Sequence, residues 1–323
     1  MPSTLSIKPP ADFDLPRDVC SYGYFLLAPN RWDPRRQTFQ RSLSLRGGPT
    51  SLEISQRGPG APLRIASTRT LARGERAELE RGLSRMLRLD LGPERIAAFH
   101  RVDPRWKASG RGRLFRSPSL FEDVIKTVTS CNVTWPSTVH MNTRLCDVLG
   151  EKIGSTGLRT FPSPKTIARA RPATLRARCR VGYRDQRIVD LARLFTLSPS
   201  RGGIDVEWFE DPTTPDEAIR DRLLDLPGIG PYAAANIMQL LGHFHQLPLD
   251  TESVRHGRNI LGFKGTPAQL MKKVRDHFAP FGEFAFLSYW FEIWAFYEHK
   301  NGPSTTWERD GSGKLFTAAH LNA

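Results

Sequence analysis

The chain has 323 residues, of which 39% are hydrophobic and 25% are charged, a composition typical of a globular protein with about two domains. Lys and Arg (47) outnumber Asp and Glu (33), and the formal charge of +14 points to a polyanionic partner. No apolar run approaches the roughly 20 residues of a membrane helix, and the N-terminus lacks a signal-peptide core, so we expect a soluble, intracellular protein without membrane contact.

The first part of the chain predicts an antiparallel sheet. Short β-type runs at residues 22–27, 38–45, 51–56 and 63–66 alternate with turns rich in Gly and Pro. From Leu71 onward the apolar spacing becomes helical. We therefore predict an α+β fold with three parts: an N-terminal antiparallel sheet domain with flanking helices at 15–110, a mainly α-helical core at 111–300, and a flexible tail at 301–323.

Helices are predicted at 165–170, 185–197 and 216–226, the first and last of which open on Ser-Pro or Thr-Pro pairs. The stretch 281–297 is dense in aromatic residues, which predicts a mostly buried helix. The four cysteines lack C-x-x-C spacing and are expected to be small buried hydrophobes: Cys20, Cys131, Cys146 and Cys179. The pair His243 and His245 has no third ligand at suitable spacing, so no metal site is predicted there.

Residues 223–237 predict two helices joined by a tight turn, a helix-hairpin-helix. The first helix is expected to end at Leu226 and the second to open at Pro231. Gly228 and Gly230 lack Cβ, so they can adopt left-handed angles and let the main chain approach a ligand closely. The unpaired N–H groups at the start of the second helix favour an anion, which a DNA phosphate would supply.

Asp250 follows an apolar run shortly after this hairpin. An isolated Asp at this place is expected to be the N-cap of a helix that begins at Thr251. The hairpin LPGIGPYAAANI followed by LPLDTESVR also resembles, in residues, order and spacing, the signature of the helix-hairpin-helix (HhH-GPD) DNA glycosylase superfamily. Further strings in the chain are similar to the 8-oxoguanine and alkylpurine (3-methyladenine) glycosylase group, whose members have an N-terminal antiparallel sheet domain.

This resemblance implies an enzyme of base excision repair that binds double-stranded DNA, flips a damaged base and hydrolyses its N-glycosidic bond. It implies no catalytic metal and no cofactor other than a structural Na⁺ or K⁺ at the carbonyls of Leu226 and Ile229. Asp250 would be the catalytic carboxylate that faces the sugar. The residues that match the backbone-binding hairpin are Pro227, Gly228, Ile229 and Gly230. The residues that match the gap-filling and opposite-base contacts are Asn132, Tyr183 and Arg184, for which a turn asparagine and a solvated loop are the alternatives.

Family members that also cut the strand have a lysine two residues after the second hairpin glycine, where this chain has Tyr232. The sequence thus predicts a monofunctional enzyme. Two alternatives stay open: a glycosylase/lyase of the 8-oxoguanine type that uses another amine, such as Lys264 or Lys126, and a non-catalytic protein that binds DNA lesions.

By resemblance, the base pocket contains Tyr232, Asn236, Tyr289 and Trp290. Such aromatic residues suit stacking on a positively charged alkylated purine. Glu252 stands where many relatives have a phosphate-binding histidine, and we expect it to pair with Arg255 or Arg258 instead. An arginine-rich run is interpreted either as a solvated face or as a contact with the DNA backbone: Arg169, Arg171, Arg176, Arg178 and Arg180. We expect a monomer located in the bacterial cytoplasm and nucleoid or in the eukaryotic nucleus.

Overall fold

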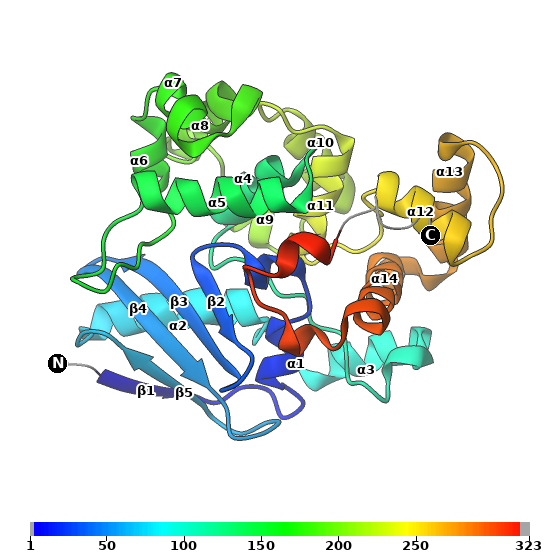
Figure 1. Ribbon diagram of the computed structural model, residues 1–323, viewed down its shortest axis with the longest axis horizontal. Helices are drawn as coiled ribbons and strands as arrows, with labels where there is room; N and C mark the ends of the chain where they lie inside the picture. The colour runs from blue at the N-terminus through cyan, green and yellow to red at the C-terminus, as the bar shows by residue number, and fades with distance from the viewer. Residues whose placement is uncertain (1–2, 317–323) are drawn as a thin grey trace.

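The computed structural model describes residues 3–316 and has the predicted α+β architecture, a sheet followed by helices (Figure 1). Five strands form one antiparallel sheet in the order β1-β5-β4-β3-β2. The strands are β1 (Ser3–Ile7), β2 (Asn30–Asp33), β3 (Thr38–Leu45), β4 (Gly48–Ser55) and β5 (Leu63–Ser67). The helices are α1 (Leu15–Val19), α2 (Arg73–Leu87), α3 (Pro93–Val102), α4 (Leu120–Ser130), α5 (Trp135–Leu149), α6 (Pro164–Ala168), α7 (Pro172–Thr174), α8 (Asp185–Leu194), α9 (Val206–Glu210), α10 (Asp216–Leu224), α11 (Pro231–Leu241), α12 (Thr251–Asn259), α13 (Pro267–Phe278) and α14 (Ala285–Asn301).

Two of the sheet predictions are wrong. Residues 22–27 do not form a strand; they form a short 3-10 helix, η1 (Gly23–Leu26), whose side chains are all buried. The Asn30 side chain donates to the Tyr24 carbonyl at 2.8 Å, which stabilises this turn, and Asn30 itself begins β2. The sheet also starts earlier than residue 15, because β1 pairs with β5 through contacts such as Leu5 with Ile65. As an edge strand, β1 lacks the strongly apolar pattern that would identify it in the sequence.

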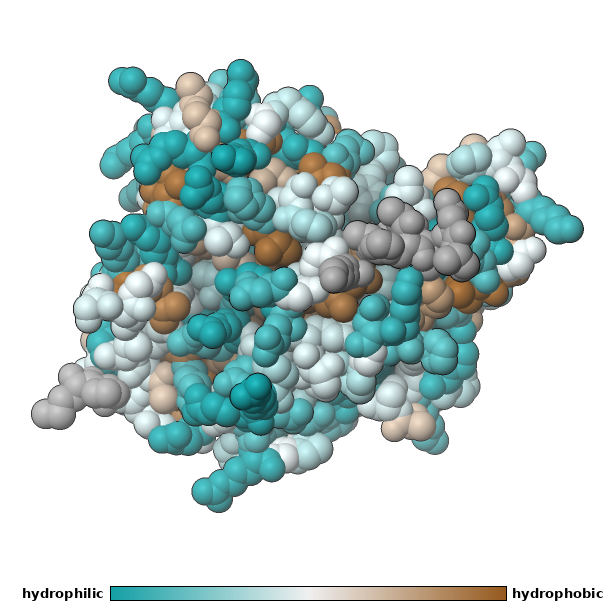
Figure 2. Space-filling model, viewed as in Figure 1, coloured by the Kyte–Doolittle hydropathy of each residue, from teal (hydrophilic) through white to brown (hydrophobic). Residues whose placement is uncertain are grey.

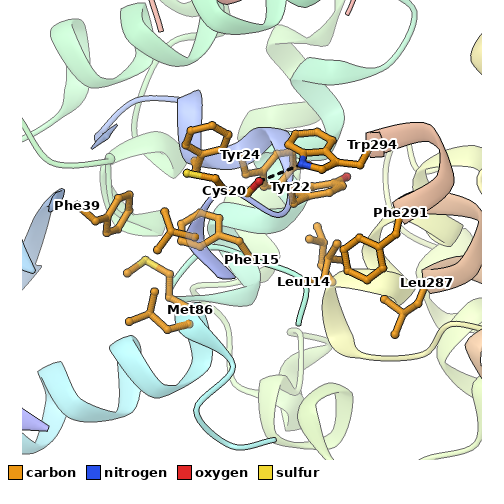
Figure 3. Close-up of a cluster of buried hydrophobic side chains, with 14 of the residues drawn as sticks. Cys20, Tyr22, Tyr24, Phe39, Met86, Leu114, Phe115, Leu287, Phe291 and Trp294 are labelled. Atoms are coloured by element: carbon orange, nitrogen blue, oxygen red, sulfur yellow. Dashed lines mark hydrogen bonds between the residues drawn. The ribbon is translucent and has the colours of Figure 1, made fainter. Parts of the chain in front are cut away.

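Two hydrophobic clusters form the interior. The first joins the sheet and α2 to α13 and α14, and the second lies among helices α4 to α11. Figure 3 shows part of the first cluster, in which Trp294 of α14 lies beside Cys20, Tyr22 and Tyr24. Although α14 falls in the range 111–300 predicted for the helical core, it therefore packs with the sheet. Its aromatic residues are mostly buried, as predicted, and Ala279–Phe284 precede it as a 3-10 turn.

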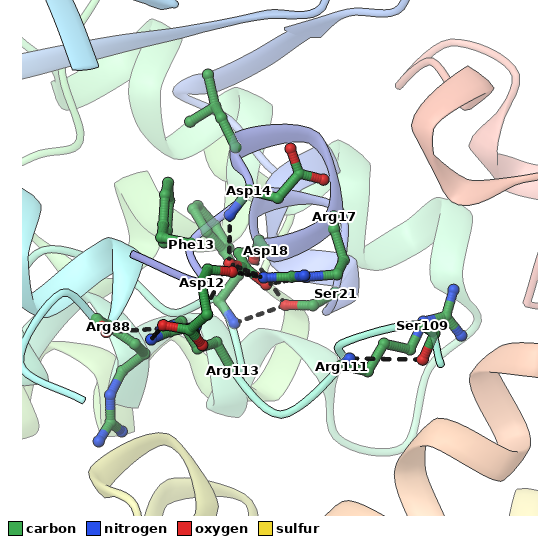
Figure 4. Close-up of polar contacts among 12 residues, drawn as sticks. Asp12, Phe13, Asp14, Arg17, Asp18, Ser21, Arg88, Ser109, Arg111 and Arg113 are labelled. Carbon is green, nitrogen blue, oxygen red and sulfur yellow. Dashed lines mark hydrogen bonds and ion pairs between the residues drawn. The ribbon is translucent and has the colours of Figure 1, made fainter. Parts of the chain in front are cut away.

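Buried ion pairs join segments that are distant in sequence. Around α1, Arg113 bonds Asp12 at 2.7 Å and lies 3.8 Å from Asp18, which also bonds its neighbour Arg17 at 2.8 Å (Figure 4). A second cluster joins the sheet to the helical part, because Arg41 of β3 contacts Glu122 of α4 at 2.5 Å and Lys126 contacts the same carboxylate at 2.8 Å.

The predicted flexible tail is wrong for residues 302–316, which we call the C-terminal strap. Trp307 and Ser312 are buried, and the Trp307 ring lies 5.1 Å from that of Trp294. Ser312 Oγ accepts from the Trp135 indole N–H at 3.2 Å, and Arg309 Nε donates to the Leu26 carbonyl at 2.9 Å. The polar composition of the strap gives no indication of these contacts in the sequence, because their partners come close only in the folded chain. The rest of the predicted tail, 317–323, lies outside the described residues.

Cys20, Cys146 and Cys179 are buried, as predicted, whereas Cys131 is only partly buried; all four are free thiols. Within residues 3–316, no helix has the length and apolar character needed to cross a lipid bilayer.

Candidate active site

The hairpin joins α10 to α11. Helix α10 ends at Leu224, two residues before the predicted end, and α11 opens at Pro231 as predicted. Gly228 has the left-handed φ of +77°, whereas Gly230 is extended with φ −98°, so only the first glycine is required by backbone conformation. Ile229 is buried while both glycines are exposed, and the turn thus presents bare main chain to solvent.

Helix α11 brings the hairpin against the rest of the site. Its small residues, Ala233, Ala234 and Ala235, are buried, which permits close packing on its neighbours. Tyr232, Asn236 and Gln239 lie on one side of the helix and line a cavity.

Asp250 is the N-cap of α12, as its local sequence predicts. Its Oδ1 accepts from the backbone N–H groups of Glu252 at 2.8 Å and Ser253 at 3.2 Å, and Ser253 Oγ accepts in return from the Asp250 N–H at 3.1 Å. This reciprocal capping box fixes the carboxyl group. Burial raises the pKa of Asp250 above its ordinary value, and the backbone N–H groups and the Tyr232 hydroxyl offset only part of this effect.

The cavity has a volume of about 380 Å³ and unites the predicted site residues. Asp250 and all four residues predicted for the base pocket line it, namely Tyr232, Asn236, Tyr289 and Trp290. The remaining walls include residues that sequence reasoning missed: Tyr22, Tyr24, Trp135, Gln239, Trp294, Tyr297 and Phe316. Tyr22 comes from the N-terminal segment and Phe316 from the C-terminal strap, and no local pattern in either segment indicates a pocket.

Acidic groups are the only charged groups that line the cavity among the described residues. These are Asp250 and Glu252, without any Lys, Arg or His. Glu252 forms the predicted ion pair with Arg255. The guanidinium of Arg255 in turn lies 4.3 Å from the centroid of the Phe296 ring. Arg255 and Phe296 do not line the cavity.

The tryptophans of the cavity have no free N–H donor. Trp290 donates to the Ser21 carbonyl at 2.8 Å. Trp294 donates to the Cys20 carbonyl at 3.0 Å (Figure 3). Trp135 donates to Ser312 Oγ. These rings therefore offer a ligand their π-electrons and apolar area.

Asn132 and Tyr183 protrude from two neighbouring loops. Asn132 follows α4, is exposed and has a left-handed φ of +52°. Tyr183 is 54% exposed, which is unusual for so large a ring. Both placements suit side chains that enter a duplex.

Arg184 is predicted to contact the opposite base, but its side chain does not point outward as that contact requires. It is buried, and its guanidinium donates to the carbonyls of Val128 at 3.1 Å and Cys131. Its charge also lies 4.4 Å from the Tyr183 ring centroid. In this conformation Arg184 ties the Asn132 loop to the Tyr183 loop, and its donors are directed into the protein.

Arg187, which sequence reasoning also missed, connects the Tyr183 loop to the hairpin. It lies 5.3 Å from the Tyr183 ring centroid, and its Cδ is 2.5 Å from the position a Cβ would take at Gly228. The exposed aromatic ring and the exposed turn thus lie close to the same arginine.

The two lysines considered as alternative amines for a lyase reaction do not line the cavity. Lys126 is fully buried beside Glu122, and Lys264 is exposed in the segment between α12 and α13. The two histidines also have a local role, because the Nδ1 atoms of His243 and His245 contact the carboxylate of Asp216 at 2.6 and 2.7 Å. No group of three metal-binding side chains occurs in the part of the chain that the structure describes.

A larger hollow of about 660 Å³ opens beside β2 and β3. Its lining mixes arginines and carboxylates, and it contains none of the predicted site residues. The smaller aromatic cavity is therefore the candidate active site.

No family model matches the sequence, and no curated protein matches it either. Solved structures do match in fold. The chain is similar to a 3-methyladenine DNA glycosylase from Archaeoglobus fulgidus, with a TM-score of 0.65 and 17% identity, over 91% of this chain and 98% of the other. It is also similar to an 8-oxoguanine glycosylase/lyase from Clostridium acetobutylicum. The apo form of that enzyme gives a TM-score of 0.64 and 14% identity, over 90% and 95% of the two chains. Its complex with double-stranded DNA containing cytosine opposite 8-oxoguanine gives 0.63 and 16%, over 93% and 99%. This chain has the fold of the helix-hairpin-helix DNA glycosylases.

Proposed function

We propose that the protein is a monofunctional DNA glycosylase that excises alkylated purines from duplex DNA. The observation that carries this proposal is the position of Asp250, which is held by a capping box in an aromatic cavity beside the hairpin. An ionised carboxylate there stabilises the oxocarbenium character of the sugar as the base departs, and it orients or deprotonates the attacking water.

DNA binding begins at the hairpin. The exposed backbone at Gly228 and Gly230 receives a phosphate at the N-terminus of α11, and carbonyls of Leu226 and Ile229 hold a monovalent cation. Asn132 and Tyr183 fill the space that the flipped nucleotide leaves. The five arginines of the run 169–180 are all exposed in a region around α6 and α8 that is mostly hydrophilic in Figure 2, and they bind the neighbouring DNA backbone.

The monofunctional assignment is supported by the lining of the cavity. Lysine is absent from it among the described residues, and Tyr232 occupies the place of the family's Schiff-base lysine. A phenol cannot form an imine with the sugar, so water is the nucleophile and an abasic site is the product.

The charge of the cavity lining supports alkylated purines as the substrate class. Ring alkylation gives a purine a positive charge, which aromatic faces and the two acids Asp250 and Glu252 attract. No cationic side chain on the described walls opposes that charge.

Single-turnover excision from duplexes that carry 3-methyladenine, 7-methylguanine or 8-oxoguanine tests the proposal. We expect release of the methylated bases without strand cleavage, and a loss of about a thousandfold in Asp250→Asn with DNA affinity retained. Asp221→Asn, which neutralises an exposed carboxylate on α10, is the control. Activity on 8-oxoguanine alone would refute the substrate class, and a borohydride-trapped adduct would refute the monofunctional mechanism.

A further inference from the structure

Gln239 is a buried polar residue of the cavity whose role the chemistry above does not explain. It lies one turn along α11 from Asn236 and is 1% exposed. Glutamine is rarely buried so fully without a use for both ends of its amide.

The hydrogen bonds around Gln239 fix which way its amide points. Asn236 Nδ2 donates to the Tyr232 carbonyl at 3.2 Å, so Asn236 Oδ1 must point toward Gln239. That oxygen accepts from Gln239 Nε2 at 2.7 Å. The same Nε2 donates to the Tyr22 hydroxyl at 3.1 Å, and this hydroxyl donates to Asn236 Oδ1 at 3.3 Å. Reversing the Gln239 amide would bring two carbonyl oxygens together, so the network requires the present orientation.

This orientation leaves Gln239 Oε1 as an acceptor that is buried without a hydrogen-bond partner among the described residues. A buried acceptor normally has a partner, because desolvation without a hydrogen bond is unfavourable. The tryptophan N–H groups that line the cavity are already engaged elsewhere and do not satisfy this acceptor, whereas a ligand that carries an N–H donor would.

We propose, building on the glycosylase function above, that Gln239 Oε1 accepts a hydrogen bond from the exocyclic amino group of the purine in the cavity. Alkylation at a ring nitrogen leaves the 6-amino group of adenine and the 2-amino group of guanine intact. The aromatic walls stack on any flat purine, and Gln239 selects among such bases those that carry an amino donor.

Binding of free bases tests this contact separately from cleavage. Two matched pairs each differ in a single amino group: 3-methyladenine with 3-methylpurine, and 7-methylguanine with 7-methylhypoxanthine. Quenching of tryptophan fluorescence reports binding, because Trp135, Trp290 and Trp294 line the cavity. In the wild type we expect the amino base of at least one pair to bind about tenfold more tightly. The pair that discriminates shows whether the 6-amino or the 2-amino group is read.

Gln239→Met keeps the length of the side chain and removes the acceptor, so we expect it to abolish this preference; Gln239→Leu serves if the methionine variant does not fold. The matched control is Tyr22→Phe, which removes a hydroxyl from the same network but leaves Oε1 in place. It should change the affinity for both members of a pair by the same factor. A wild type without preference in either pair, or a Gln239 variant that keeps the preference, would overturn the proposal.

The two proposals fail in different ways. Excision of 3-methyladenine from a duplex depends on Asp250 and the hairpin, whereas the preference among free bases depends on Gln239. A protein that discriminates between free bases but excises none is not a glycosylase. One that excises methylated bases with equal rates in wild type and Gln239→Met does not read the amino group through Gln239.

Discussion

Asp250 combines two properties that the sequence presents as alternatives. It is the N-cap of α12, and its carboxyl group lines the cavity. The capping bonds hold Oδ1 in place, so the helix that Asp250 caps also orients the charge that, in the mechanism proposed above, acts on the sugar.

Asp250→Asn separates stability from activity. Asn caps helices about as well as Asp, and it carries no charge whose burial opposes folding. Because the pKa of Asp250 is raised in the folded state, its ionisation disfavours folding, and this penalty grows as pH rises from the ordinary Asp value through the folded value. We expect the variant to melt at or above the wild-type temperature at pH 7, with the difference shrinking as pH falls through the folded pKa and disappearing near the ordinary value of 3.8.

Excision by the wild type should follow the same ionisation. Activity should fall on the acid side with a midpoint above the ordinary Asp pKa of 3.8. Thermal melts and excision rates over the same pH series measure both effects. A variant that melts well below the wild type at neutral pH would show that capping, not charge burial, dominates at Asp250.

Local sequence was sufficient for Asp250 and the hairpin because a cap and a tight turn are determined by a few adjacent residues. It was insufficient for Tyr22 and Phe316, which meet at the cavity only after the whole chain has folded. Arg184 shows a related difficulty: its type and place indicate a DNA contact, but its partners are main-chain carbonyls that no sequence pattern identifies.

At the scale of elements, the hairpin contains two glycines with different requirements. Gly228→Ala forces an alanine to φ +77° and places its Cβ 2.5 Å from Arg187 Cδ. In Gly230→Ala, the new Cβ would have no atom within 4 Å, and the backbone would keep an ordinary φ of −98°. We expect Gly228→Ala to lose about 1–2 kcal/mol of unfolding free energy and Gly230→Ala to lose little.

DNA affinity should fall in both glycine variants, at least tenfold, because each methyl group stands where main chain would approach a phosphate. Denaturant melts and DNA titrations of the two proteins separate folding from binding. Undiminished affinity of a well-folded Gly230→Ala protein would exclude this turn from the DNA contact.

The C-terminal strap is the second element with a clear consequence. Trp307 is 3% exposed and packs on Trp294, and Phe316 lies 5.5 Å from the same ring. Trp307→Ala should lower the unfolding free energy by about 3–5 kcal/mol. It should also weaken binding of methylated bases, since it removes support from Phe316 at the cavity wall. Normal stability in a denaturant titration would show that the strap is not part of the cooperative fold.

At the scale of the whole molecule, the buried cluster of Arg41, Glu122 and Lys126 connects the sheet to α4. Arg41 and Lys126 lower the pKa of Glu122 to about 2 despite its burial. Because the folded pKa is depressed, the stability that Glu122 contributes is complete above its ordinary pKa of 4.5 and is lost as pH falls toward 2.

Glu122→Gln leaves two buried cations without a counter-charge and should cost about 3–5 kcal/mol near neutral pH. Glu53→Gln is the matched control, because Glu53 pairs with Arg36 at the surface and should change stability by less than about 1 kcal/mol. Urea unfolding of both variants gives the comparison. Equal costs would show that burial of the Glu122 cluster adds nothing to the joint between sheet and helices.

One further consequence follows from Arg184, whose guanidinium donates to the Val128 and Cys131 carbonyls beside Asn132 and also contacts the ring of Tyr183. If Asn132 and Tyr183 enter the duplex as proposed, this link predicts that the two side chains enter and leave the base stack together. The protein would then test a DNA duplex with both side chains in a single concerted movement, and mispaired or weakly stacked base pairs would admit both at once.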